Sequence, residues 1–484
     1  MDINAGNILL IGSILLLLSV IAGKTSSKFG VPTLIFFLIV GVLAGSEGIG
    51  GIHFDNAEIA QFTGIIALNF ILFSGGLDTD WKKVKHIVWR GVSLSTIGVF
   101  VTALSVGLFV HYVFDFDLLV GLLLGSVVSA TDAAAVFSIL RSRGVKLKGS
   151  LAPVLELESG SNDPMAYFLT ISLTSLITVG DTSVPQLLVL FLKEFILGAA
   201  IGLAMGKFSH WLINKIKLDS EGLYPVLVLG LALFTYSATH SIGGNGFLAI
   251  YLSAIVLGNS SFIHKRSLIR FYEGQAWLMQ IILFLTLGLL VFPSKIMPVV
   301  GMGLFISAFL IFVARPLGVF VSLIFFKTKI QNKLFISWVG LRGGVPIVFA
   351  TYPLIARVAG ADMIFNLVFF ISVSSVLFQG TTLPLVAKLL KVTLPEKTGA
   401  AMVTGSGEQE RSIRKEIEVP HSAAIVGKKI VNLDLPSSLY IISILREGHY
   451  FQPIGSTRVE AGDVLQIFAD DEKALQVIYP FLNK

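Results

Sequence analysis

Long apolar runs, separated by short breaks of charged, glycine and proline residues, fill most of this 484-residue chain. A run of about 17–25 apolar residues is long enough to cross a bilayer as a helix. The pattern predicts about thirteen membrane-spanning helices, near residues 7–23, 31–46, 59–77, 88–111, 117–140, 150–178, 185–213, 222–240, 243–262, 271–292, 297–326, 333–357 and 363–391. We therefore expect an all-α polytopic membrane protein.

The loops between these runs alternate in charge. One set is basic and the other carries acids with few basic residues; the basic set holds Lys24, Lys28, Lys82, Lys83, Lys85, Arg90, Arg141, Arg143, Lys146, Lys148, Lys215, Lys217, Lys265, Arg266, Arg270, Lys327, Lys329 and Lys333. Basic loops stay on the cytoplasmic side of a membrane. The alternation predicts an N-terminus outside and a C-terminus in the cytoplasm.

The composition supports this assignment. Hydrophobic residues make up 54% of the chain and charged residues only 14%, whereas an ordinary soluble domain has about 25% charged residues. Cysteine is absent, which excludes disulfides and thiolate metal sites. The net charge of +6 lies in short loops, so it indicates membrane topology and no nucleic-acid partner.

The character of the chain changes after Lys391. We expect a transmembrane domain over residues 1–392, a polar linker over 393–411 and a small α+β cytoplasmic domain over 412–484. Alternating apolar residues predict strands at Ile413–Val419, Tyr440–Leu445 and Val464–Ala469, with a hairpin turn at Glu447-Gly448 and a final helix from Glu472, capped by Asp471.

A weak internal repeat links the two halves of the apolar region. Ile71-Leu72-Phe73 recurs as Ile282-Leu283-Phe284, an offset of 211 residues (282 − 71), and the same offset aligns Thr131 with Arg342. Inverted repeats build the midplane sites of many secondary transporters. The repeat predicts that the fifth and twelfth spans are counterparts, each broken near its polar residue.

Three carboxylates lie within the fifth and sixth spans: Asp132, Glu158 and Asp163. A charged side chain at the bilayer centre costs roughly 2.5–3.5 kcal/mol on insertion scales. In the sixth span Glu158 and Asn162 are four residues apart, as are Ser159 and Asp163, so they share one helix face. This pattern favours a site for a cation, a proton or both. The alternative is a polar network that only joins helices.

The fifth span supplies facing side chains, Thr131 and Asp132, among small residues that allow close packing. A buried carboxylate is neutralised by a cation or by a proton, but not by both at once. A carrier that reorients only when neutralised would couple two opposite fluxes. Asp132 has a second interpretation, as the N-cap of a helix that starts after a break.

Arg342 lies in the run Gly340-Leu341-Arg342-Gly343-Gly344-Val345-Pro346, and we interpret it as the one basic residue deep in a late span. The paired glycines and the proline predict an unwound segment. We expect Arg342 to neutralise a buried acid and to fix the broken helix. The alternative is an arginine at a loop end that reaches the membrane surface.

These motifs resemble those of the monovalent cation/proton antiporter superfamily, and the Asn162-Asp163 pair resembles its NhaP-type branch. The resemblance covers about residues 5–391. It implies a secondary transporter, not an enzyme, that exchanges K⁺ or Na⁺ for H⁺ by alternating access, electroneutrally, in pH and cation homeostasis. It also implies crossed broken helices, no cofactor, and a homodimer in the bacterial inner membrane whose core domain moves against a dimer domain.

The resemblance also implies roles for individual residues. Asp163 would be the principal carboxylate that carries the proton or cation, with Asp132 beside it. Thr131, Ser159 and Glu158 would complete a monovalent cation site, Glu158 by holding water or orienting the site. Asn162 and Arg342 would stabilise the crossing helices.

One position departs from the family pattern. The third span of these proteins commonly carries an acid before a Gly-Gly pair, and here Ser74 stands at that position. A bridge from Asn162 through that acid to Arg342 is therefore in doubt, which leaves Asp132 or Glu158 as the partner of Arg342.

The C-terminal segment is similar to the TrkA-C (RCK-C) regulatory domain, notably at Ala424–Lys429 and Gly462–Leu465. This combination of domains favours K⁺ over Na⁺. Such domains dimerise and some bind cyclic di-AMP, so both a dimerising and a sensing role stay open.

Two other classes of protein remain as alternatives. A ligand-gated cation channel also has buried acids and regulatory domains of this type, but the sequence shows no loop resembling a selectivity filter. An intramembrane hydrolase could use Asp132 and Asp163 as paired aspartates. Ion flux measured against proteolysis distinguishes the three classes.

Overall fold

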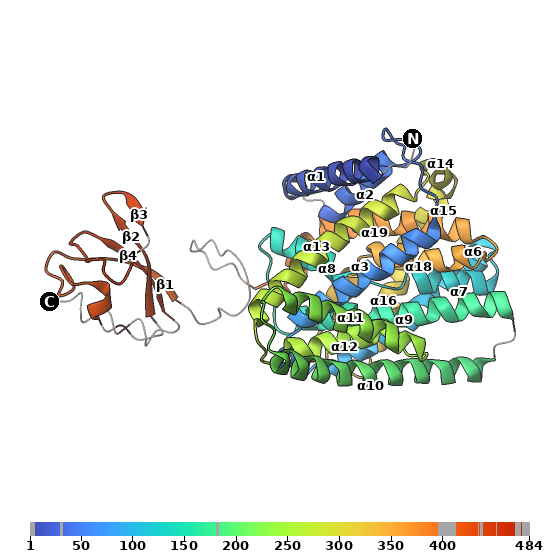
Figure 1. Cartoon of the computed structure of the whole chain (residues 1–484). Coiled ribbons are helices and arrows are strands. Elements are labelled where there is room, and N and C mark those ends of the chain that lie inside the picture. The colour runs from blue at the N-terminus through green and yellow to red at the C-terminus, as the bar shows by residue number, and fades with distance from the viewer. Residues whose placement is uncertain are drawn as a thin grey trace. The chain divides into compact units, whose positions relative to one another are not determined.

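Apolar helices and a small sheet are divided between two units of the chain, Met1–Pro395 and Glu396–Lys484 (Figure 1). The structure is a computed structural model that describes residues 5–29, 32–180, 183–394, 413–433, 435, 439–451, 453–469 and 476. The first unit extends to Pro395, so it includes Thr393 and Leu394, which the sequence analysis assigned to the linker.

Six helical stretches among the described residues are long and apolar enough to cross a membrane. They are α3 (Ala57–Asp78), α5 to α6 (Val88–Ser93 and Val99–Phe114, joined by the π-helical turn Leu94–Gly98), α10 (Val184–Ile216), α11 (Leu223–Ser241), α14 to α16 (Pro293–Ile296, Val300–Phe309 and Arg315–Ser322) and α19 (Ala361–Leu389).

The other helices of the first unit are shorter, broken or more polar. They are α1 (Ala5–Phe29), α2 (Thr33–Ala44), α4 (Trp81–Val84), α7 (Leu118–Val127), α8 (Ala133–Ser142), α9 (Leu151–Val179), α12 (Gly246–Gly258), α13 (Lys265–Leu289), α17 (Ile330–Trp338) and α18 (Gly344–Ile355). Each predicted span coincides with one of these helices or with a broken pair, which confirms the predicted helical membrane fold.

Two spans are broken in the middle. Val128–Asp132 separates α7 from α8, and Val339–Gly343 separates α17 from α18. The second halves of the two pairs start at Ala133 and Gly344, which are 211 residues apart (344 − 133). The breaks therefore follow the offset of the sequence repeat.

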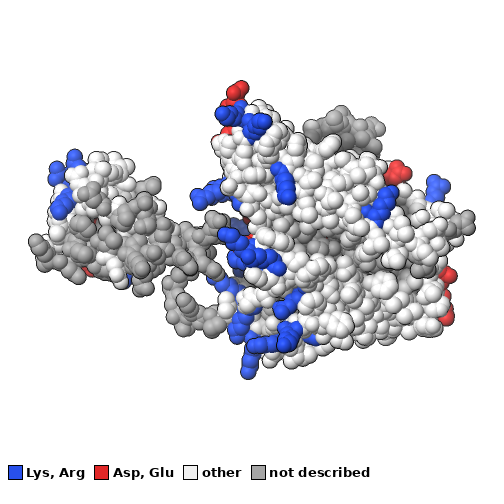
Figure 2. Space-filling model, turned by 90° about the horizontal axis from the view of Figure 1, so that it is seen from below, with Lys and Arg blue, Asp and Glu red and all other residues white. Residues whose placement is uncertain are grey.

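The surface of the first unit matches its membrane location. Figure 2 shows Lys and Arg side chains gathered mainly at one end of this unit and a largely uncharged surface along the rest of the visible face. Large apolar side chains such as Phe325 and Trp89 are exposed. Apolar exposure on this scale is typical of a surface that faces lipid.

The last residues of the first unit pair with the loop between α8 and α9. Leu147 and Thr393 form an isolated antiparallel bridge. The Lys148 N–H donates to the Val392 carbonyl at 2.8 Å, and the Leu394 N–H donates to the Lys146 carbonyl at 2.9 Å. The chain that follows α19 is therefore attached to the loop between two neighbouring helices.

The second unit contains a four-stranded antiparallel sheet in the order β1-β4-β2-β3. Its strands are β1 (Ile413–Glu418), β2 (Leu439–Arg446), β3 (His449–Phe451) and β4 (Val464–Ala469). The three predicted strands are confirmed. Glu447 and Gly448 form the predicted turn, both with positive φ angles (49° and 84°). The predicted helix from Glu472 and its cap Asp471 lie outside the described residues.

A buried aspartate, Asp463, stabilises the turn that precedes β4 through hydrogen bonds. Arg446 donates to both carboxylate oxygens of Asp463, at 2.7 and 2.8 Å. Burial by itself raises the pKa of Asp463, but the hydrogen bonds from Arg446 and from the Glu460 backbone outweigh it and hold this pKa below its ordinary value. Asp463 is therefore charged, and it holds the second unit together through Arg446.

Candidate functional site

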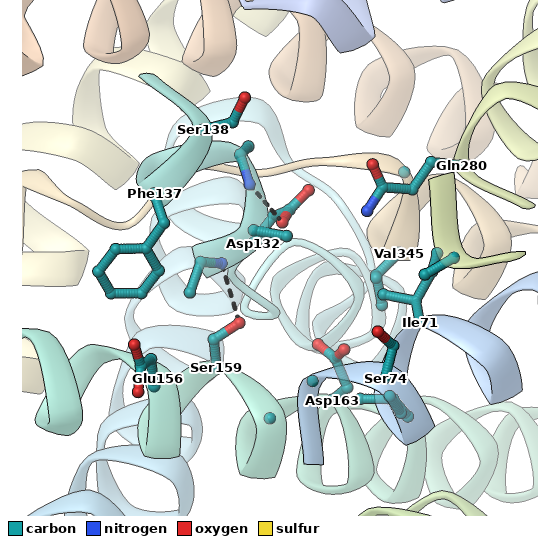
Figure 3. Close-up of a pocket in the computed structure, with 18 of the residues that line it drawn as sticks. Ile71, Ser74, Asp132, Phe137, Ser138, Glu156, Ser159, Asp163, Gln280 and Val345 are labelled. Atoms are coloured by element: carbon teal, nitrogen blue, oxygen red, sulfur yellow. Dashed lines mark hydrogen bonds between the residues drawn. The ribbon is translucent and has the colours of Figure 1, made fainter. Parts of the chain in front are cut away.

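A cavity of about 380 Å³ enters the first unit between α3, α8, α9 and α13 (Figure 3). Its lining combines apolar side chains with polar side chains from the fifth and sixth predicted spans, which carry Asp132 and Asp163. Exposed acids lie at its mouth: Asp78, Glu156 and Glu273. At its inner end lies Asp163, which is only 5% exposed.

The helix α9 positions Asp163 at the inner end of the cavity, and Asn162 lies next to it on the same helix. It continues without interruption through Pro164, which lies inside it. Asn162 is fully buried, and its amide donates to the Thr131 hydroxyl. Asp163 Oδ1 is buried and has no hydrogen-bond partner among the described residues. Asp163 is thus a carboxylate held at the end of a polar cavity with one oxygen left free for a proton or a cation.

The break between α7 and α8 brings Thr131 and Asp132 to the lining of the same cavity as Asp163. Asp132 is the N-cap of α8, and its Oδ1 accepts from the Ala135 N–H at 3.0 Å. The Ser159 hydroxyl donates to the Thr131 carbonyl and accepts from the Ala133 N–H, both at 2.9 Å. The capping interpretation of Asp132 is therefore confirmed, and the same residue also lines the cavity.

The two breaks cross and touch each other. The Asp132 N–H donates to the Leu341 carbonyl at 2.8 Å, so the extended segments are joined by their backbones. Gly343 lies directly against the Asp132 side chain, where a Cβ would overlap Asp132 Oδ2. The crossing therefore requires a glycine at this position.

Replacing Gly343 with alanine is expected to displace the Asp132 carboxylate and to reduce cation-driven proton transport. We expect a loss of at least about tenfold, because misplacing a reacting group by about 1 Å can cost more than this. The measurement is the initial rate of dequenching of a pH dye in proteoliposomes. Gly75→Ala is the matched control, since Gly75 lines the cavity but a Cβ there meets nothing within 4 Å. Equal rates in the two variants would contradict the prediction.

Arg342 holds the crossing through backbone carbonyls. It is fully buried, its Nε donates to the Val128 carbonyl at 2.8 Å, and its Nη1 donates to the Gly340 carbonyl. It forms no ion pair among the described residues, so the predicted pairing with Asp132 or Glu158 is wrong. Free carbonyls of the two breaks accept from its Nε and Nη1 instead, while its buried Nη2 has no hydrogen-bond partner among the described residues.

The sequence analysis missed a second buried arginine, Arg315 of α16. Arg315 forms an ion pair with Glu158, and both side chains are only 2% exposed. Glu158 consequently does not line the cavity with the other predicted ligands. Arg315 was a visible signal, since it is the sole charged residue of the predicted span 297–326. Arg342 is therefore not the one deep basic residue of the late spans.

The acids at the cavity mouth were also missed. Asp78 lies one residue beyond the predicted span 59–77, but it is the last residue of α3 and lines the cavity. Glu156 precedes Asp163 by seven residues on α9 and shares its face. That spacing could have revealed Glu156 from the sequence. Ser74, where the family resemblance predicts an acid, lines the cavity as well (Figure 3).

Two protein families match this chain. The model of the transmembrane sodium/hydrogen exchanger matches residues 13–389, and that of the TrkA-C domain matches residues 415–480. The chain belongs to the sodium/hydrogen exchanger family. It is therefore a multi-pass secondary transporter and not an enzyme, and its second unit contains a TrkA-C domain.

Similar proteins of the same type align with nearly the whole of this chain. The K(+)/H(+) antiporter NhaP2 of Shewanella sp. (strain ANA-3) is 40% identical over 476 residues, which cover 97% of this chain and 82% of the relative. The K(+)/H(+) antiporter NhaP of Alkalimonas amylolytica is 39% identical over 446 residues, or 92% and 77%.

A solved structure confirms the fold of the exchanger. The sodium proton antiporter MjNhaP1 of Methanocaldococcus jannaschii, determined at pH 8, superposes with a TM-score of 0.69 at 26% identity and covers 79% of this chain and 99% of its own. The predicted antiporter family, its NhaP-type branch and the TrkA-C domain are all confirmed by these comparisons.

Proposed function

We propose that this exchanger moves K⁺ in one direction and H⁺ in the other by alternating access and electroneutrally, with Na⁺ as the second candidate ion. The relatives that share about 40% of its residues over nearly its whole length are named as K(+)/H(+) antiporters. Its proposed role is the homeostasis of pH and monovalent cations.

One observation supports the exchange mechanism most directly. Asp163 is buried at the inner end of the cavity, and no cationic side chain among the described residues pairs with it. An unpaired buried carboxylate is costly in its charged form unless a counterion neutralises it. A proton and a cation therefore compete for the same carboxylate, and each can leave only when the other replaces it.

The cation site we propose consists of Asp163, Asp132, Thr131 and Ser159. All four line the cavity, and all offer oxygen atoms, which hard cations prefer. Asn162 orients the site through its bond to Thr131, and Arg342 holds the crossed breaks in place. Glu158 belongs to the support of α9 through Arg315 and not to the cation ligands.

Location and partners follow from the same family. We propose a homodimer in the bacterial inner (plasma) membrane, with the N-terminus outside and the TrkA-C domain in the cytoplasm, because the basic loops mark the cytoplasmic side. In this orientation the cavity opens to the cytoplasm, since Asp78 and Arg141 at its mouth adjoin basic loops. The TrkA-C domain either dimerises or binds a ligand such as cyclic di-AMP.

The test is proton flux in proteoliposomes that contain a trapped pH dye, with K⁺ and then Na⁺ added over a series of pH values. Dequenching triggered by K⁺ at lower concentrations than by Na⁺ would support the proposal. A response that depends on membrane potential and carries net current would indicate a channel. Silence with both ions in correctly inserted protein would contradict the proposed exchange.

A further inference from the structure

The cavity ends at Asp163, although alternating access requires a route from this residue to the other side of the membrane. Three helices run past the closed end of the cavity: α9, α12 and α18. Each supplies a lining residue near this end, and these are Asp163, Tyr251 and Val345. The residues one helical turn farther from the cavity therefore show what closes the route from Asp163 to the other side of the membrane.

On all three helices that next residue is aromatic. Tyr167 follows Asp163 by four residues, Phe247 precedes Tyr251 by four, and Phe349 follows Val345 by four. Residues four apart share a helix face, so each ring lies directly beyond its lining residue. None of the three aromatic residues lines the cavity, and all are buried.

The three rings contact one another in a closed triangle. The ring centroids are 5.2 Å apart for Tyr167 and Phe247, 5.9 Å for Tyr167 and Phe349, and 6.4 Å for Phe247 and Phe349. These distances are typical of direct aromatic contact. The triangle therefore places a cluster of three buried rings directly beyond Asp163.

The triangle also joins two groups of helices. The helices α9 and α18 pack on each other and both contact α7, whereas α12 packs mainly with α10, α3 and α11. The helix α3 also packs against α18 and so borders both groups. Tyr167 and Phe349 therefore come from one group and Phe247 from the other. A movement of α12 relative to α9 and α18 would separate the rings without unfolding any of the three helices.

A half-buried carboxylate, Glu194, lies beyond the triangle. Asn245, the N-cap of α12, donates its amide to the Pro164 carbonyl at 3.1 Å and its backbone N–H to the Glu194 carbonyl at 3.0 Å. Glu194 of α10 has a buried Oε2 without a hydrogen-bond partner among the described residues. Asn245 and Lys193 interact with the Glu194 carboxylate, but its Oε2 is left without a hydrogen bond.

We propose that Tyr167, Phe247 and Phe349 form the barrier between Asp163 and the second side of the membrane, and that Glu194 is the carboxylate that cations meet first on that side. The proposal rests on the proposed exchange, because only a transporter needs a second route to Asp163. The barrier closes while the cavity is open, and it opens when the two groups of helices move apart.

The barrier is tested with single cysteines, which are unique labels because the natural chain has none. Phe349→Cys in sealed vesicles is exposed to a membrane-impermeant maleimide on the side opposite the cavity. We expect labelling to be several-fold faster while a K⁺ gradient drives exchange than without the gradient, and the increase to vanish when Asp163→Asn is added. Unchanged labelling during measurable exchange would overturn the barrier. Phe247→Cys, on the other group of helices, replaces Phe349→Cys if the latter does not transport.

Glu194 is tested by the side from which the cation is added. We expect Glu194→Gln to raise the KM for K⁺ added on the second side at least about threefold, since an entrance carboxylate raises the local cation concentration. The KM for K⁺ added on the cavity side should stay unchanged. Asp362→Asn, an exposed carboxylate in the first turn of α19, is the control. If Glu194→Gln leaves the KM on the second side at the wild-type value, or raises it equally on both sides, the role of Glu194 is overturned. Wild-type vesicles that show no transport would contradict the proposed exchange itself.

Discussion

Asp163→Asn is expected to abolish cation-driven proton transport while the protein is still made, inserted and folded. Asparagine keeps the size and polarity of the side chain but can neither bind a proton nor neutralise a cation. Because Asp163 has no ion-pair partner among the described residues, its replacement leaves no charge unbalanced. The measurement is dye dequenching in proteoliposomes, combined with gel filtration of the purified variant.

The matched control is Asp55→Asn, which removes an aspartate whose side chain is 69% exposed. We expect this variant to transport at the wild-type rate. Exchange retained in Asp163→Asn would remove Asp163 as the carrier and shift the assignment to Asp132. Loss of transport in both variants would show that the assay does not distinguish Asp163 from an exposed aspartate and would contradict the prediction.

Glu158→Gln is expected to have its largest effect on stability. Glu158 and Arg315 form an ion pair in which both side chains are 2% exposed. Removing one member of a buried pair leaves the other charge uncompensated, which typically costs about 3–5 kcal/mol. Thermal unfolding in detergent, followed by tryptophan fluorescence, should show a strongly lowered Tm. This outcome differs from that of Asp163→Asn, which should lose transport without losing stability.

Two further variants separate the ion pair from simple loss of a charge. Glu221 pairs with His264 at the surface and is 60% exposed, so Glu221→Gln should change stability by less than about 1 kcal/mol. Glu158→Leu combined with Arg315→Met removes both charges and should recover much of the lost stability. A wild-type Tm in Glu158→Gln would show that Arg315 is satisfied by its other contacts.

The sequence was sufficient for the fold because the signals of a membrane protein are local. Hydropathy located the spans, and Gly343-Gly344 together with Asp132 marked the two breaks. The repeat offset correctly paired these breaks. The capping of α8 by Asp132 was recognised as an alternative because an aspartate before a helix has few other roles.

The errors concern contacts between residues that are distant in the sequence. Glu158 and Arg315 are 157 residues apart, and hydropathy gives no information about which helices become neighbours. Arg342 was expected to need an acid, but the two broken helices expose backbone carbonyls that accept from its Nε and Nη1 instead. Exposed acids such as Glu273 joined the cavity only through the packing of α13 against α3.

The bridge between Leu147 and Thr393 determines which part of the first unit a force on the C-terminal segment reaches first. Tension on the segment after Leu394 reaches first the loop that joins α8 to α9, the helices that hold Asp132 and Asp163. A chain shortened after Lys391 would lack the residues that pair with this loop, so removing the tail there also alters the anchoring of the transport site. A shortened chain that ends after Pro395 keeps the anchor and isolates the effect of the tail alone.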